Sequence, residues 1–154
     1  MRKVMLLLAV FGLVGLLCAA DNPWTGTWKL NLAKSKISDP SMMPKSETIK
    51  VVAQGNDMKT TVDGVDAQGK AFHSAWSGKW DGKNYPVTGD PDIDMSAIAQ
   101  IDTNTITVVN KKAGKEVISY RVTLSKDRKT QTVVAKTKDA KGQEVNITAV
   151  YDKQ

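Results

Sequence analysis

The chain has 154 residues, of which 41% are hydrophobic, 6% aromatic and 25% charged, and its formal net charge is +6. This length suits one domain that buries roughly two-thirds of its unfolded surface. The Lys and Arg residues are scattered, with no basic run and no basic stripe interleaved with aromatic residues. We therefore expect no nucleic-acid partner.

The first twenty residues have the layout of a cleavable export signal. Arg2 and Lys3 give a positive start, residues 4–17 are an apolar and glycine run, and Cys18-Ala19-Ala20 is a small-residue cleavage site. The apolar run is shorter than the roughly twenty residues that a membrane span needs. We predict a signal peptide over 1–20 and a mature domain over 21–154, exported to the periplasm or the cell exterior, without a stable membrane span.

Cys18 is the only cysteine in the chain. A lipoprotein anchored through Cys18 is the alternative, and the bulky Leu17 before it argues against that processing. Cleavage after Ala20 would leave no cysteine and would lower the net charge from +6 to +4. An exported domain without disulfides must be stabilised by its apolar core.

Beyond residue 45, apolar and polar residues alternate, and turn residues recur about every dozen positions. Asp-Gly and Asn-Asp pairs between β-rich runs are typical of hairpins, because these residues tolerate a positive φ. We predict strands over 25–32, 47–54, 57–63, 70–80, 84–88, 93–101, 105–111, 116–125, 130–138 and 144–152.

The alternation gives the predicted strands one apolar face. In the last strand this face holds Val145, Ile147, Ala149 and Tyr151. A meander with one apolar face must bury it, and rolling up also removes the exposed edges. We predict an all-β fold, a single antiparallel up-and-down β-barrel of eight to ten strands, in which the last strand pairs with the first.

The first predicted strand carries the residues with the clearest structural role. Gly26 precedes Trp28 by two positions, so both lie on the same face of the strand. Glycine permits close approach of a neighbouring segment, and the indole fills the space beside it. We expect Gly26 and Trp28 to be structural residues of the barrel.

The stretch Trp24-Thr25-Gly26-Thr27-Trp28-Lys29-Leu30 resembles the first strand of the calycin group, which includes lipocalins, fatty-acid-binding proteins and avidins. The sequence from Gly26 to Leu30 is most similar to that of the fatty-acid-binding branch. The whole chain also resembles small uncharacterised lipocalin-like proteins that bacteria export. The resemblance implies a barrel that holds a small hydrophobic molecule.

Two features depart from the fatty-acid-binding pattern. Residues 33–46 lack the amphipathic period of that branch's helical lid and contain two prolines. The Arg-x-Tyr pair that would hold a ligand carboxylate reads Ala149-Val150-Tyr151 here. Tyr151 keeps a possible hydrogen-bonding role, whereas the charged clamp does not carry over. Residues 33–46 are either a surface loop or a lid, with Met42 and Met43 as adaptable apolar contacts.

The sequence holds no coherent catalytic or metal-binding set. His73 is the only histidine, and the carboxylates of Asp90, Asp92 and Asp94 lack the glycine and glutamate of a calcium loop. A nucleophile elbow is absent from the sequence. We therefore expect a non-enzymatic protein without cofactor or metal.

Our leading interpretation is a monomeric, exported binding protein for a small hydrophobic ligand. We expect Phe72, Trp76 and Trp80 to form the wall of its cavity, Met42 and Met43 to form a lid, and Arg121 or Tyr151 to supply the polar contact. Arg121 lies on the less apolar face of its strand, where outward exposure is the simpler expectation. The alternative is a surface-binding module for a carbohydrate polymer or another exported protein, with an outward Trp76 and a filled barrel core.

Overall fold

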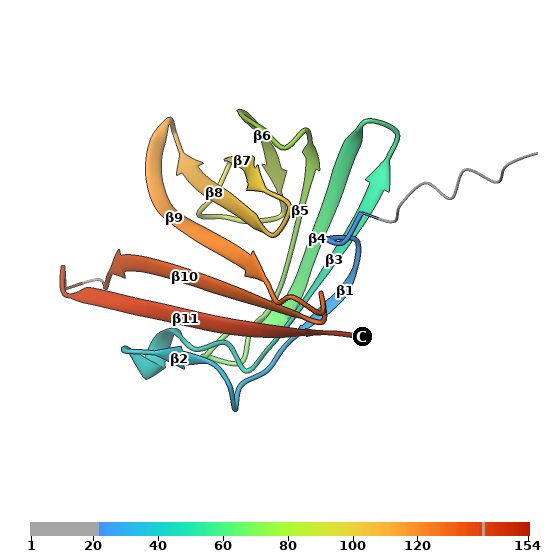
Figure 1. Cartoon of the computed structure of the whole chain (residues 1–154). Coiled ribbons are helices and arrows are strands. Elements are labelled where there is room, and N and C mark those ends of the chain that lie inside the picture. The colour runs from blue at the N-terminus through green and yellow to red at the C-terminus, as the bar shows by residue number, and fades with distance from the viewer. Residues whose placement is uncertain (1–21, 140) are drawn as a thin grey trace, which may run out of the picture.

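The computed structural model describes residues 22–139 and 141–154, so the predicted signal peptide and Cys18 lie outside the described residues. In the described part, eleven strands form one antiparallel sheet, with a single turn of 3-10 helix (Figure 1). The elements are β1 (Gly26–Leu30), β2 (Lys36–Ile37), η1 (Pro40–Met42), β3 (Ser46–Gln54), β4 (Asp57–Val65), β5 (Ala71–Gly78), β6 (Asp81–Thr88), β7 (Met95–Asp102), β8 (Thr105–Lys112), β9 (Lys115–Leu124), β10 (Thr130–Lys138) and β11 (Glu144–Lys153).

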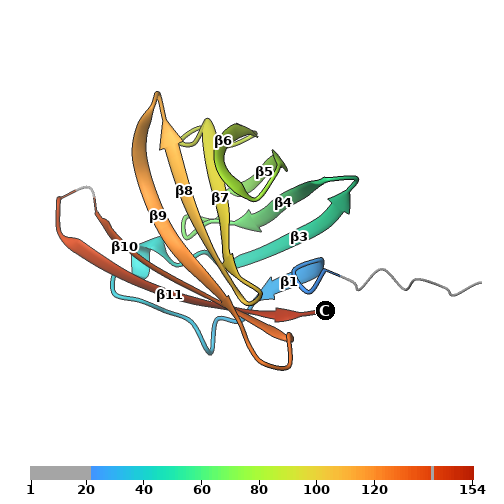
Figure 2. The same cartoon turned by 45° about the horizontal axis from the view of Figure 1, so that its top comes forward.

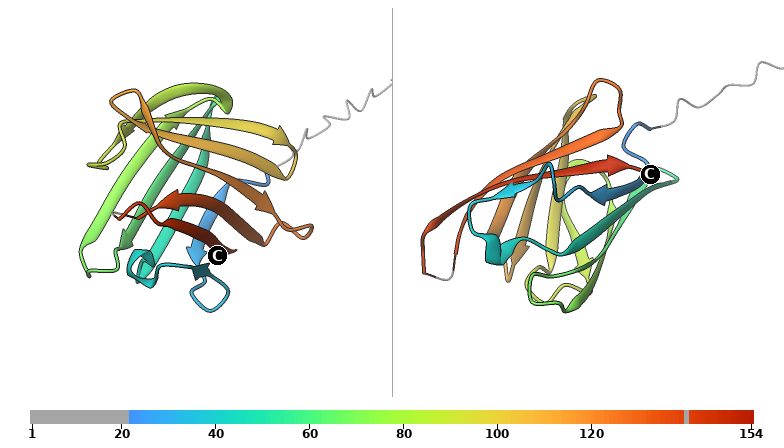
Figure 3. Two further views of the ribbon diagram at one scale, coloured as in Figure 1. Left: turned by 90° about the vertical axis from the view of Figure 1, so that its left-hand side faces the viewer. Right: turned by 90° about the horizontal axis from the view of Figure 1, so that it is seen from below.

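The sheet closes on itself. Each strand from β3 to β11 pairs with the next one, and β1 pairs with both β3 and β11. In the closing register, Trp28 lies opposite Lys153 and Leu30 lies opposite Tyr151, and β1 and β11 run side by side in Figure 3. The prediction of a closed antiparallel up-and-down barrel is confirmed.

β2 continues the closing seam beyond β1, because Ile37 pairs with Ile147 further along β11. Between the two short strands the chain bulges outward. The Ser35 hydroxyl spans this gap: it accepts a 2.9 Å hydrogen bond from the amide of Val150 and donates a 2.7 Å bond to the carbonyl of Asn31. The predicted first strand therefore ends earlier than expected, at Leu30, and Leu32 is 47% exposed.

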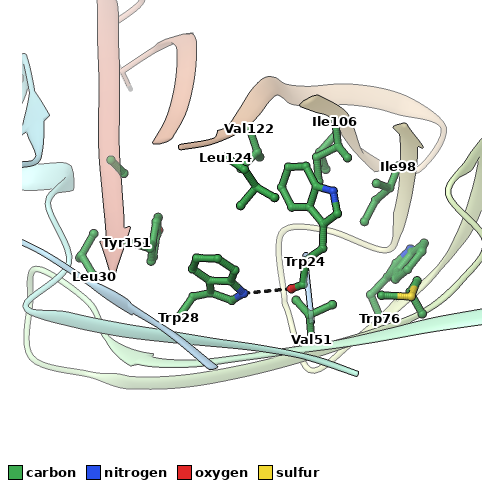
Figure 4. Packing of buried hydrophobic residues seen from close by; sticks show 13 residues of the cluster. Trp24, Trp28, Leu30, Val51, Trp76, Ile98, Ile106, Val122, Leu124 and Tyr151 are labelled. Carbon is green, nitrogen blue, oxygen red and sulfur yellow. Dashed lines mark hydrogen bonds between the residues drawn. The ribbon is translucent and has the colours of Figure 1, made fainter. Parts of the chain in front are cut away.

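Tryptophans fill one end of the barrel, called the closed end below. The side chain of Trp28 is fully buried, and its Nε1 donates a 3.0 Å hydrogen bond to the carbonyl of Trp24 (Figure 4). Trp24, just before β1, is buried as well, and its ring meets Trp80 edge-on at 5.5 Å between centroids. Trp24 and Trp28 belong to one buried cluster with aliphatic side chains from the surrounding strands, namely Val51, Ile98, Ile106, Val122 and Leu124 (Figure 4).

The close approach expected at Gly26 is present. Its φ of 130° lies in the region that favours glycine, and a Cβ there would stand 2.7 Å from Cε of Lys153. The Lys153 ammonium lies 5.0 Å from the centre of the Trp28 ring, within the range of a cation–π contact. Gly26 thus makes room for the lysine that covers the closing tryptophan.

The segment between β1 and β3 contains no long helix, as its prolines predict. Its regular structure consists of β2 and η1, with Asp39 capping η1 by accepting from the amide of Ser41. No helix in the part of the chain that the structure describes is both long and apolar enough to cross a membrane.

Replacing Trp28 by Ala tests its role in closure. We expect the free energy of unfolding to fall by about 3–5 kcal/mol, because the cavity forms where β1, β3 and β11 meet. Urea unfolding followed by circular dichroism measures this change. Leu32→Ala, on the exposed side of the same segment, is the control and should stay within about 0.5 kcal/mol of the wild type. A Trp28→Ala variant as stable as that control would contradict the assigned role.

Candidate functional site

The barrel interior is not completely filled. Toward the end opposite the tryptophans it contains a partly open cavity of about 340 Å³. This volume is at the lower end of the range of about 300–1,000 Å³ typical of small-molecule sites. Apolar side chains line most of the cavity, among them Leu30, Ile49, Val62, Phe72, Val133 and Ile147.

A carboxyl–hydroxyl pair interrupts this apolar lining. Glu47 near the start of β3 and Tyr151 on β11 both point inward, and the tyrosine hydroxyl donates a 2.7 Å hydrogen bond to Oε1 of Glu47. The two residues come from strands on either side of β1, so barrel closure brings them together. Glu47 keeps some accessible surface, and it lines both the cavity and its mouth.

The largely buried position of Glu47 shifts the pKa of its carboxyl group. Burial raises the pKa of the Glu47 carboxyl above its ordinary value, and the hydrogen bond from Tyr151 only partly opposes this effect. Burial also raises the pKa of Tyr151 well above 10, and the nearby Glu47 charge adds to the increase. Tyr151 therefore remains a protonated donor at neutral pH.

Further polar groups lie around the same cavity. Burial, opposed by a hydrogen bond with Asn110 and assisted by the charges of Glu47 and Asp90, raises the pKa of Tyr120 on β9 to about 12. Asp90, in the β6–β7 connection, lines the cavity and accepts hydrogen bonds from the amides of Asp92 and Ile93 at 2.8 and 3.1 Å. The lining thus includes two acidic side chains and two tyrosine hydroxyls.

The cavity opens into a depression of about 790 Å³, called the mouth below. Three connections surround it: residues 39–44, the β4–β5 turn and the β10–β11 turn. Glu47, Pro44 and Phe72 line both the mouth and the cavity, so they mark the passage between the two.

The barrel wall is also open beside the cavity, between β9 and β10. Their pairing stops at Tyr120 and Ala135, after which β9 follows β8 and β10 follows β11, and the strands diverge (Figures 1 and 2). A surface groove of about 480 Å³ occupies the gap. Ile118 lines both this groove and the cavity. Because β9 and β10 are not paired here, side chains such as Ile118 separate the cavity from the groove.

Four residues proposed from the sequence lie at the cavity or its mouth. Phe72, Tyr151 and Met43 line the cavity, whereas Met42 lines the mouth and is 40% exposed. Phe72 is held against Gly64 of β4, where a Cβ would stand 2.6 Å from the phenyl ring. The lid role of Met42 and Met43 stays a prediction.

Three other proposed residues lie outside the cavity: the expected cavity-wall positions of Trp76 and Trp80 are corrected, whereas Arg121 has the outward exposure that was the simpler expectation. Trp76 points inward but belongs to the closed end: it is 6% exposed, and its Nε1 donates a 3.1 Å bond to the carbonyl of Ser96. Trp80 follows β5 and packs against Trp24, outside the cavity lining. Arg121 is exposed on the outer face of β9.

Glu47 was not among the residues predicted from the sequence, yet it lies at the centre of the polar group. A usable signal was present, because Glu47 shares the inward face of its strand with Ile49 and Val51. Its partner Tyr151 is 104 residues away in the sequence. No local pattern connects residues at that separation.

The structure offers no metal-ligand cluster among the described residues. His73 lies on the outer surface, where its Nδ1 is 2.6 Å from Oδ1 of Asp63. Asp94 uses one carboxylate oxygen to accept a 2.8 Å hydrogen bond from the amide of Ala113, so it supports the β8–β9 turn.

No family model and no curated protein matches this chain. Among solved structures, a redesigned β-barrel shares 10% identity with a TM-score of 0.49, covering 90% of this chain and 97% of its own. The protein EF1p2_mFAP2b bound to DFHBI shares 11% identity with a TM-score of 0.47, covering 86% of this chain and 94% of its own. A de novo fluorescence-activating β-barrel shares 10% identity with a TM-score of 0.42, covering 85% and 94%. The barrel fold itself follows from the strand pairings, and the calycin resemblance stays a prediction from the first strand.

The raised pKa of Glu47 predicts a pH-dependent stability difference. The folded protein holds the Glu47 proton more tightly than the unfolded chain does, so protonation of Glu47 favours the folded state. This contribution to stability is complete below about pH 4.5 and is lost as the pH rises through the pKa of Glu47 in the folded protein. Glu47→Gln keeps an acceptor for Tyr151 without the charge. At neutral pH we expect it to be more stable than the wild type by on the order of 1 kcal/mol.

Urea unfolding at several pH values measures this difference, which should shrink toward zero below about pH 4.5. Glu116→Gln, at an exposed site on β9, is the matched control and should show no such trend. A constant difference between Glu47→Gln and wild type across this range would contradict the burial of an ionisable Glu47.

Proposed function

We propose that this chain is an exported, non-enzymatic binding protein that holds one small, mainly apolar molecule inside its barrel. The observation that carries the proposal is the cavity of about 340 Å³, lined by apolar side chains and reached through the mouth. A mainly apolar cleft or cavity with a few converging polar groups is the usual form of a small-molecule site.

The arrangement of the two barrel ends supports this function. Packed tryptophans occupy one end of the barrel, and the cavity lies toward the other end, which opens to solvent. Met43 and Phe72 then supply adaptable and aromatic surface near the entrance. A ligand entering through the mouth would place its apolar part against Ile49, Val133 and Ile147.

The alternative of a surface-binding module rests on two structural expectations, and neither is met. Trp76 is 6% exposed rather than outward, and the barrel core retains an empty volume. Export is also part of the proposal, and it is supported by the signal-like sequence of residues 1–20. The lipocalin-like relationship likewise rests on the Gly26–Leu30 stretch and on the closed barrel that follows it.

Filling the cavity tests the proposed function. Ala135 on β10 lines the cavity, and Ala135→Leu would place additional side-chain volume inside it. We expect the affinity for the uncharged fluorescent probe phenylnaphthylamine to fall about tenfold or more, because the probe and the new side chain compete for the same space. Fluorescence titration of the purified mature protein measures the affinity.

Val134→Leu is the matched control, since Val134 is the preceding residue of the same strand and is 51% exposed. Its affinity should equal that of the wild type. Equal loss in both variants, or no binding of the probe to the wild type, would contradict cavity binding.

A further inference from the structure

The charges that line the cavity are of one sign. Among the described lining residues, the charged side chains are Glu47 and Asp90, and neither Lys, Arg nor His is present. The mouth continues this pattern, with Asp39, Asp66 and Asp139 against Lys138 and Lys141. An anionic head group inside the cavity would therefore meet carboxylates and no opposite charge, and at the mouth it would meet more carboxylates than lysines.

This local charge is opposite to that of the whole chain, whose net charge is +6, or +4 without the first twenty residues. A random selection of charged side chains from such a chain would contain more cations than anions. The mouth aspartates have structural roles in turns, as Asp66 shows by accepting a 2.8 Å hydrogen bond from the amide of Lys70. Glu47 differs from them, because it lies within a strand and turn formation does not require it.

We propose, as a refinement that rests on the proposed function, that the cavity selects ligands with a cationic amine head group, and that Glu47 is the residue that recognises it. The apolar tail would lie along the cavity lining, and the ammonium would lie at the passage where Glu47 faces both the cavity and the mouth.

The geometry around Glu47 fits this role. Tyr151 donates to Oε1, which orients the carboxyl group, while Oε2 accepts no hydrogen bond from the described residues. An ammonium is a donor without acceptor capacity, so it complements a carboxylate oxygen that lacks a donor. The burial that raises the pKa of Glu47 also makes a bound cation more favourable there, because a partner charge offsets the loss of hydration.

Three probes with the same apolar tail separate the head group from the tail: decylamine, decanol and decanoate, each below its micelle concentration. Isothermal titration calorimetry on mature wild-type protein at neutral pH gives the three affinities. We expect decylamine to bind about tenfold or more tightly than decanoate, with decanol between them.

In Glu47→Gln, we expect decylamine affinity to fall about tenfold, while decanol affinity changes by less than about twofold. Glu116→Gln removes the same charge from an exposed site on β9 and should leave all three affinities unchanged. This variant controls for general attraction of an amine to the protein surface.

The outcomes distinguish the two proposals. If decanol binds but decanoate binds as tightly as decylamine, the amine selectivity is overturned and cavity binding stands. If decylamine binds Glu47→Gln and wild type equally, Glu47 is not the recognising residue and the inference is likewise overturned. If none of the three binds the wild type, the proposed function itself fails.

Discussion

The pairing of β1 with β11 around the buried indole of Trp28 is the constraint on which the other features depend. Without this seam, the sheet would expose two free edges and its apolar face. The seam is short, with Trp28, Lys29 and Leu30 in direct register, and β2 extends it along β11. Its stability therefore depends on burial of the tryptophans more than on the number of paired residues.

Barrel closure also determines where the cavity and its polar side chains lie. Trp24 and Trp28 fill one end of the barrel, so the unfilled volume lies at the other end, together with Glu47, Tyr120 and Tyr151. These polar groups come from strands that meet only because the ring is closed. In a filled core a buried carboxyl group would be strongly destabilising. Here it is partly accessible through the mouth, which makes its presence compatible with a stable barrel.

The sequence predicts the barrel well and the site only in part. A period of two identifies inward and outward faces, as Arg121 on the outer face and Val122 on the inner face illustrate. The same period does not say how far along the barrel axis a residue lies. Phe72 and Trp76 share one face of β5, yet Phe72 reaches the cavity and Trp76 belongs to the closed end. The two residues are four positions apart along β5, and Trp24, which helps fill the closed end, lies before the first strand, where the period of two gives no signal.

The central claim is that the cavity between the tryptophans and the mouth is a binding site for an apolar molecule. Intermolecular nuclear Overhauser effects between bound decylamine and methyl-labelled protein test it directly. If the ligand lies in the cavity, the decyl chain contacts Ile49, Val133 and Ile147, which line it, and does not contact the exposed Ile101, Val117 and Val134. Contacts confined to the exposed methyl groups, with the cavity methyl groups unaffected at saturation, would contradict it.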